Sequence, residues 1–114
     1  MIRKLVLAGA ITGLLAVPAL AEPIEGVWLR PSTGALVRFQ PCGGGFCGIV
    51  QSGEYKGKSI GTMTGSGGSY TGKITDLAEN KTYKGKAKVN GGTMSLQGCV
   101  LGGLICKGED WQRQ

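Results

Sequence analysis

The residues with the most evident chemistry are four cysteines, which occur as two pairs: Cys42 with Cys47, and Cys99 with Cys106. Thiols at such spacings form disulfides, bind a metal ion or take part in redox reactions. The C-x4-C and C-x6-C spacings are longer than the usual zinc knuckle, and the sequence has no histidine, so metal binding is disfavoured. Neither pair has the C-x-x-C spacing of redox sites. We therefore predict two structural disulfides and no metal site.

The pairing of the cysteines is open from the sequence alone, because four cysteines allow three connectivities. In the chain-entropy model, a cross-pairing that closes a loop of about 58 residues stabilises by about 4 kcal/mol, against roughly 2 to 2.5 kcal/mol for each local loop. Each local pair, however, encloses a glycine-rich turn whose flanking residues can approach closely. On these grounds we favour Cys42 with Cys47 and Cys99 with Cys106.

Residue types that commonly carry out catalysis are sparse. Without histidine, a serine or cysteine nucleophile lacks its commonest base. The carboxylates fall in predicted turns and strand ends, with no pair that the spacing places across a cleft: Glu54, Asp76, Glu79, Glu109 and Asp110. We expect no catalytic residues and no cofactor, and we expect that the protein is not an enzyme.

The N-terminus has the pattern of an export signal. Arg3 and Lys4 precede an apolar run over residues 5–20, which ends in a small-x-small cleavage pattern. A transmembrane anchor is disfavoured, because the run has about 16 residues where a span needs about 20. We predict a cleavable secretory signal peptide over residues 1–21, and an exported protein located in the periplasm of a Gram-negative-type bacterium or secreted.

The chain that remains after cleavage, residues 22–114, is long enough for one small domain. Loss of the two basic residues near the N-terminus leaves 11 basic and 7 acidic residues, and the net charge of +4 weakly favours anionic partners. No window shows helical apolar spacing, whereas short alternating runs bounded by turn residues recur. This pattern predicts an all-β domain.

The elements that must position the cysteines are therefore short strands. We expect them over residues 26–30, 35–40, 46–51, 59–64, 69–76, 82–89, 93–99 and 110–114. Their near-neighbour connections predict a small antiparallel up-and-down barrel, or a strongly curved sheet, of about seven or eight strands, since closure removes unpaired edges. A sandwich is the competing architecture.

The strand over residues 82–89 has the clearest alternation. It places Lys84, Lys86 and Lys88 on one face and small or apolar residues on the other. Such a stripe commonly keeps an exposed barrel face soluble, and it also allows weak contact with an anionic surface. Nucleic acid is disfavoured as a partner, because no aromatic residues are interleaved with the lysines.

The order of motifs along the mature chain resembles that of an exported bacterial family known as domain of unknown function 2147. The motifs are Pro23-Ile24-Glu25-Gly26-x-Trp28, Pro41-Cys42-Gly43, Cys47-Gly48, Gly72-x-Ile74, Lys81-Thr82-Tyr83, Gly98-Cys99 to Cys106, and Trp111. Within residues 52–68 the chain is shorter than is usual for that family. The resemblance implies an exported, lipocalin-like barrel and no known activity.

The pair Gly26 and Trp28 is also similar to the signature of the first strand of lipocalin-like barrels. In that signature a basic residue of the last strand covers the tryptophan. The resemblance implies that Arg113 covers Trp28, an interaction worth about 0.5 to 2 kcal/mol. Trp111 and Arg113 would then join the last strand to the first as the clasp of the barrel.

Our first functional hypothesis is a non-catalytic binding module for a small apolar or amphipathic ligand. The candidate lining residues are Val37, Phe39, Ile49, Tyr70, Ile74, Tyr83 and Met94. Among them we select Phe39, Tyr70, Tyr83 and Met94 as ligand-binding residues. All of these side chains are equally suited to a packed core, because small barrels often fill their interior.

The alternative hypothesis is an envelope protein-interaction or inhibitor module that acts through its disulfide-stapled loops. Its apolar contacts would be Phe46 in the first loop and Leu101, Leu104 and Ile105 in the second. Loops that are pre-organised by disulfides lose little entropy on binding, which suits this role. The partner is then either an unidentified small molecule or an envelope protein, and we expect a monomer.

Overall fold

The structure is a computed structural model that describes residues 21–114, so the predicted leader lies outside the described residues except for Ala21. The described chain forms eight strands and one short 3-10 turn. They are β1 (Gly26–Arg30), β2 (Ala35–Cys42), β3 (Gly45–Val50), β4 (Ser59–Ser66), β5 (Ser69–Asp76), β6 (Lys81–Asn90), β7 (Thr93–Val100), η1 (Leu101–Gly103) and β8 (Ile105–Arg113).

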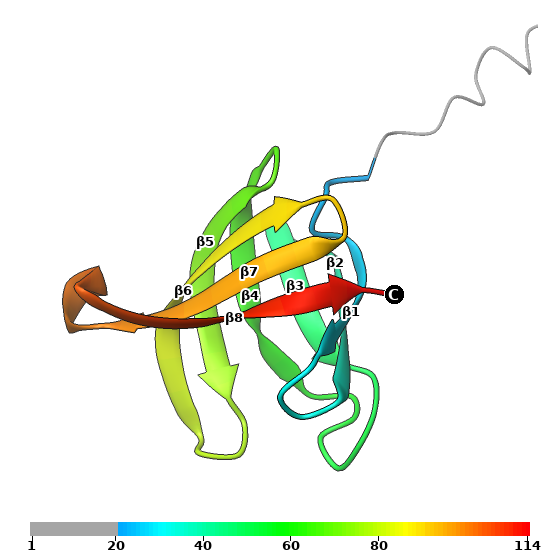
Figure 1. Ribbon diagram of the computed structural model, residues 1–114, viewed down its shortest axis with the longest axis horizontal. Coiled ribbons are helices and arrows are strands. Elements are labelled where there is room, and N and C mark those ends of the chain that lie inside the picture. Colours follow the sequence, from blue (N-terminus) through cyan, green and yellow to red (C-terminus); the bar gives the residue numbers. More distant parts are fainter. Residues whose placement is uncertain (1–20) are drawn as a thin grey trace, which may run out of the picture.

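The eight strands close into a barrel in sequence order, as Figure 1 shows. Every strand pairs antiparallel with its neighbours, and β8 returns to pair with β1, where Arg113 lies opposite Trp28. The predicted all-β, up-and-down barrel is confirmed, and the sandwich and the open curved sheet are excluded. Closure leaves no strand of the described chain at an unpaired sheet edge.

Alternation along the strands decides which side chains enter the barrel. In β6, Gly85 and Ala87 are buried, whereas Lys84, Lys86 and Lys88 are exposed. This is the period-2 pattern of a strand with one face in the core and one in solvent.

Glycine allows the sheet to curve tightly, and Gly61 in β4 illustrates the reason. Its φ is +135°, a conformation that L side chains rarely adopt. A Cβ at this position would lie 1.9 Å from the carbonyl oxygen of Lys73 on β5. The backbones of β4 and β5 approach closely here because residue 61 has no side chain.

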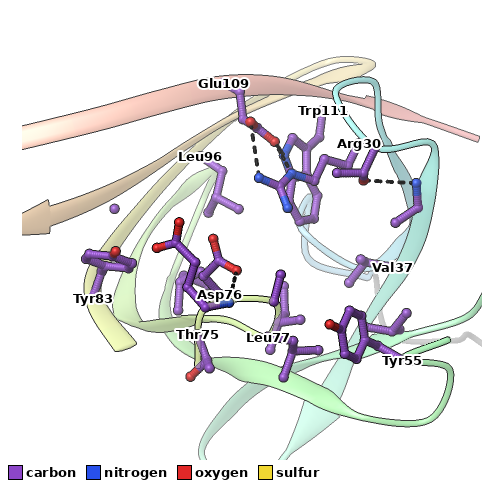
Figure 2. Close-up of a pocket in the computed structure, with 18 of the residues that line it drawn as sticks. Arg30, Val37, Tyr55, Thr75, Asp76, Leu77, Tyr83, Leu96, Glu109 and Trp111 are labelled. Carbon is purple, nitrogen blue, oxygen red and sulfur yellow. Dashed lines mark hydrogen bonds and ion pairs between the residues drawn. The ribbon is translucent and has the colours of Figure 1, made fainter. Parts of the chain in front are cut away.

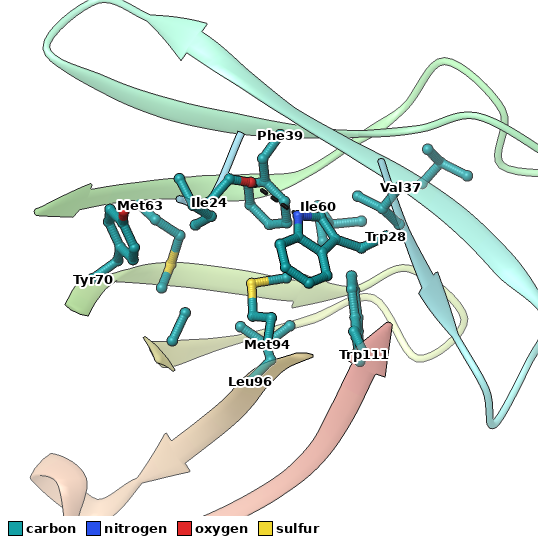
Figure 3. Packing of buried hydrophobic residues seen from close by; sticks show 12 residues of the cluster. Ile24, Trp28, Val37, Phe39, Ile60, Met63, Tyr70, Met94, Leu96 and Trp111 are labelled. Carbon is teal, nitrogen blue, oxygen red and sulfur yellow. Dashed lines mark hydrogen bonds between the residues drawn. The ribbon is translucent and has the colours of Figure 1, made fainter. Parts of the chain in front are cut away.

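One end of the barrel is filled by a tightly packed core. Trp28 is fully buried at its centre, and Figure 3 shows Met94 and Trp111 pointing toward its ring. The Trp28 indole nitrogen donates a hydrogen bond of 2.9 Å to the carbonyl of Ile24, itself fully buried. The segment before β1, residues 22–25, thus closes this end of the barrel, and we call it the plug. Its contact with the buried Trp28 holds it in place.

Arg113 holds the plug from the opposite side. Its guanidinium carbon lies 4.3 Å from the centroid of the Trp28 ring. The same guanidinium donates hydrogen bonds to the carbonyls of Glu25 (3.0 Å) and Pro23 (2.6 Å). A Cβ on Gly26 would lie 3.2 Å from the Arg113 Nη1 atom, so glycine leaves the room that the arginine occupies.

Both predicted disulfides form as local pairs, Cys42 with Cys47 and Cys99 with Cys106. The second joins residues directly opposite each other on β7 and β8, with Cα atoms 4.0 Å apart.

The last strand was predicted over residues 110–114, and this boundary is wrong, because β8 begins at Ile105. The turn η1 reverses the chain at once, through a positive φ at Leu101 (53°) and glycines after it, so β7 and β8 form a long hairpin.

Candidate ligand-binding pocket

The end of the barrel opposite the plug is hollow. It contains a pocket of about 900 Å³, lined by the β1–β2, β3–β4 and β5–β6 loops and by the adjoining strand ends. Its buried apolar lining comes from Val37, Val50, Ile60, Leu96 and Trp111. These residues belong to the same core cluster as Trp28, so the floor of the pocket is formed by the core itself.

The pocket also has aromatic walls on several sides. Figure 2 shows Trp111 near the top of the view, Tyr83 at the left and Tyr55 at the lower right, with Leu77 at the lower rim. Tyr55 and Leu77 come from loops and are half-buried against the core cluster. Side chains of this kind present broad apolar surfaces and, for tyrosine, a polar tip.

The polar part of the pocket is centred on Glu109, which β8 directs inward from its middle. Glu109 forms an ion pair with the Nε atom of Arg30 from β1 and accepts a second contact of 3.4 Å from Arg30 Nη2. The indole nitrogen of Trp111 donates to Glu109 at 2.9 Å, and the Ser32 hydroxyl lies 3.3 Å from each carboxylate oxygen. Four side chains therefore share one hydrogen-bonded network at the pocket wall.

The environment of Glu109 lowers its pKa from the ordinary value of 4.5. Burial opposes this change and would raise the pKa, but the hydrogen bonds from Arg30 and Trp111, and the charge of Arg30, together outweigh it. Glu109 is therefore a carboxylate at neutral pH.

Three further carboxylates line the same pocket: Glu54, Asp76 and Glu79. Asp76 is half-buried at the end of β5, and its Oδ1 atom accepts a hydrogen bond from the Glu79 backbone N–H (3.1 Å). Their positions in the sequence, which gave no pair across a cleft, did not indicate this grouping. The barrel brings them together because two of its loops and the middle of β8 meet at one end.

The predicted ligand-binding residues divide between pocket and core. Tyr83 lines the pocket, as do Val37 and Ile74 from the wider candidate set. Phe39, Tyr70 and Met94 do not line the pocket but lie in the core, with at most 3 % of their surface exposed. These three predicted ligand-binding residues therefore lie outside the pocket. The plug fills their end of the barrel, and alternation along a strand cannot show which end of a barrel is filled. Ile49, on β3, is not part of the pocket lining either.

Tyr70 is tied to the plug. Its hydroxyl donates a hydrogen bond of 2.8 Å to the carboxylate of Glu22, and its ring meets Phe46 edge-on with the centroids 5.8 Å apart. Burial and the bond to Glu22 raise the pKa of the Tyr70 phenol above its ordinary value of 10.0. The contacts of Tyr70 are those of a structural residue at the closed end.

The candidate interaction residues do not lie on one common surface. Phe46 is half-buried in β3 and packs against the core, so only part of its side chain is exposed. Leu101, Leu104 and Ile105 are exposed at the end of the β7–β8 hairpin. The two disulfide-bonded turns therefore do not form one surface: Cys42–Cys47 lies beside the closed end, and Cys99–Cys106 beside the open end.

Several pocket and plug residues were not selected from the sequence: Ile24, Arg30, Tyr55 and Leu77. A signal existed for two of them, because Tyr55 and Leu77 are isolated apolar residues in polar loops, where an apolar side chain commonly folds back onto the core. For the contact between Arg30 and Glu109 there was none, since 79 positions separate the two residues.

Among residues 21–114, no group of three or more histidine, cysteine or acidic side chains is placed to hold a metal ion. In the same part of the chain, no helix has the length and apolar character needed to cross a membrane.

The fold and the pocket define a class of protein: a small closed β-barrel, plugged at one end and hollow at the other. Within it, the chain belongs to the family DUF2147, described as uncharacterized protein conserved in bacteria, whose model matches residues 54–113. The matched region runs from the loop before β4 to the end of β8 and includes the aromatic and acidic pocket residues Tyr55, Tyr83 and Glu109. No curated protein and no solved structure matches the chain.

Proposed function

We propose that this protein binds a small apolar or amphipathic molecule in the pocket at the open end of its barrel. The observation that carries the proposal is the pocket of about 900 Å³ at the open end of the barrel, much of whose lining is apolar or aromatic. Small-molecule sites commonly enclose about 300 to 1,000 Å³, with a few polar groups that orient the ligand.

The distribution of lining residues supports an orientation for this ligand. Val37, Ile60 and Leu96 lie deep in the barrel and would contact its apolar part. Arg30 and Glu109 lie on the wall nearer the loops and would meet a polar group through the hydrogen-bonding capacity that the ion pair leaves free. An amphipathic molecule satisfies both regions.

We further propose that binding occurs without chemical conversion. Glu109, the most fully hydrogen-bonded carboxylate of the pocket, accepts bonds from Arg30 and Trp111 and has a lowered pKa. A carboxylate held in its ionised form by such partners is a poor general acid. Its contacts support a role in orienting a ligand.

The test uses N-phenyl-1-naphthylamine, a neutral apolar dye whose fluorescence rises in an apolar environment. We expect saturable binding by the purified protein, and at least tenfold weaker binding by Leu77→Asp, because a charge at the pocket rim opposes an apolar ligand. Leu77 lies at this rim and is half-buried.

The matched control is Leu104→Asp, which makes the same chemical change at a residue that is 86 % exposed and does not line the pocket. It should bind the dye as the wild type does, and circular dichroism should show that both variants are folded. Equal dye binding by Leu77→Asp and the wild type, or no saturable binding at all, would contradict the proposal.

Export to the periplasm is part of the proposal. Two disulfides support it, since such bonds persist in oxidising compartments. The backbone nitrogen of Glu22 also lies 2.8 Å from a carboxylate oxygen of Glu25, so cleavage before Glu22 would place the new amino terminus beside a negative charge. Intact-mass measurement of protein recovered from a bacterial envelope should give a chain that begins at Glu22; retention of residues 1–21 would contradict it.

A further inference from the structure

The large apolar side chains that are exposed in the described chain all lie at one place. They are Val100 (41 %), Leu101 (67 %), Leu104 (86 %) and Ile105 (55 %), and we call them the apolar tip. Figure 1 shows that the β7–β8 hairpin which carries them extends away from the barrel, to the left of the view. Single exposed apolar residues are ordinary, but a cluster on a projecting hairpin indicates a contact surface.

The tip is held in shape by covalent structure. The disulfide between Cys99 and Cys106 joins the two strands just behind it, and the backbone N–H of Leu104 donates to the carbonyl of Leu101 across the turn (3.3 Å). A turn that is already ordered loses little conformational entropy when it binds a partner.

The face of the barrel beside this hairpin is basic. We call Lys73 on β5 and Lys84, Lys86 and Lys88 on β6 the lysine face; all four are exposed, and Lys73 lies opposite Lys84. Lys84 is in turn opposite Cys99 on β7, so the lysine face begins next to the base of the tip.

One exposed acidic residue lies close to this surface: Asp110 on β8 is opposite Ser95 on β7, which is itself opposite Lys88 at the end of the lysine face away from the tip. Glu109 is paired with Arg30 at the pocket wall. Asp76 at the end of β5 and Glu79 in the β5–β6 loop lie at the pocket rim.

We propose that the apolar tip inserts into the surface of an anionic lipid bilayer, with the lysine face against the headgroups. Exposed leucine and isoleucine side chains partition into the interfacial region of a bilayer, while neighbouring lysines are attracted by anionic lipids. Val100 and Ile105 also line the pocket, so this orientation places the pocket mouth beside the lipid. The inference does not depend on the pocket's being occupied.

Vesicle flotation tests the proposal. Vesicles of phosphatidylglycerol with phosphatidylethanolamine should carry the wild-type protein upward in a density gradient, and vesicles of phosphatidylcholine should carry much less. Leu104→Asp should weaken partitioning about tenfold or more, since it replaces by a charge a leucine that is exposed in the free protein and would enter the bilayer on binding. The triple change Lys84→Gln, Lys86→Gln and Lys88→Gln should weaken it about fivefold for each lysine removed, and added salt should weaken the wild type similarly.

Controls with the same charge changes are available on β2, which lies four strands from β6 around the barrel. Gln40 and Arg38 are both exposed there, so Gln40→Asp and Arg38→Gln should float as the wild type does. Leu77→Asp should also float while losing dye binding, which separates this proposal from the ligand proposal.

Three results would overturn the inference. The first is failure of the wild type to float with anionic vesicles, and the second is flotation of Leu104→Asp equal to the wild type. The third is a wild-type dimer in light scattering that Leu104→Asp converts to a monomer, which would assign the apolar tip to self-association. Equal flotation with phosphatidylcholine would contradict the role of the lysine face.

Discussion

At the scale of single residues, Arg113 has the most varied set of contacts in the closed end of the barrel. Its guanidinium covers Trp28 and donates to the carbonyls of Pro23 and Glu25, so it joins the last strand, the first strand and the plug. Hydrogen bonds from a charged donor and a cation–π contact both add to stability. Arg113 is itself exposed, whereas the Trp28 ring that it covers is fully buried.

We predict that Arg113→Gln lowers the free energy of unfolding by about 1 to 3 kcal/mol, from the lost cation–π contact and charged hydrogen bonds. Urea denaturation measures this value. Gln112→Ala, at the exposed neighbouring position, is the control and should change stability by less than about 0.5 kcal/mol. Equal effects of the two changes would show that Arg113 does not secure the plug.

Glu109 predicts a dependence of stability on pH. Its pKa in the folded protein is below 4.5, whereas in the unfolded chain it returns to the ordinary value. The unfolded state therefore binds more protons in mild acid, so the stability from the Glu109 carboxylate is present above about pH 4.5 and is lost as pH falls through the folded pKa.

As pH is lowered from about 6.5 to 3, the urea midpoint should fall less steeply for Glu109→Gln than for the wild type. Glu54→Gln, which alters an exposed carboxylate, should retain the wild-type slope. If Glu109→Gln also retained it, the network with Arg30 and Trp111 would not govern the ionisation of Glu109.

At the scale of elements, the strands follow from local signals. The predicted strand over residues 69–76 coincides with β5, and the prediction for β6 differs from the structure by one residue at each end. The hairpin turns that follow β1, β2, β4 and β6 consist of glycine and other turn residues, which the sequence displays directly. The exception is β8, because the length of its hairpin depends on positive φ angles in the turn after Cys99 and not on alternation.

The close approach of β4 and β5 predicts a severe effect of a single methyl group. Gly61→Ala should cost about 3 kcal/mol or more, or prevent folding, since its Cβ would lie 1.9 Å from a backbone oxygen in a conformation strained for alanine. Thermal and urea denaturation measure the cost. Gly44→Ala is the control, because Gly44 has nothing within 4 Å and no positive φ, and it should be tolerated. Mild effects of both changes would show that the barrel can relax around residue 61.

At the scale of the whole molecule, the barrel has two unlike ends. The plug and the core fill one end around Trp28, and the other end holds the pocket lined by Trp111 and Tyr83. The apolar tip projects beside the open end, so both proposed functions belong to the same half of the molecule. The dye and vesicle experiments address that half, and the Arg113 and Gly61 variants address the scaffold that supports it.

The sequence by itself determined the all-β class and the near-neighbour order of strands, and it favoured the two local disulfides without excluding the other pairings. These properties depend on alternation, turn residues and short spacings, which are local in the chain. The tertiary structure decided which end of the barrel is filled, and therefore that Tyr70 and Met94 are core residues whereas Tyr83 lines a pocket. It also brought Arg30 to Glu109 across 79 positions. Closure of the barrel creates these contacts, and a pairing between distant strands leaves no periodic trace in either one.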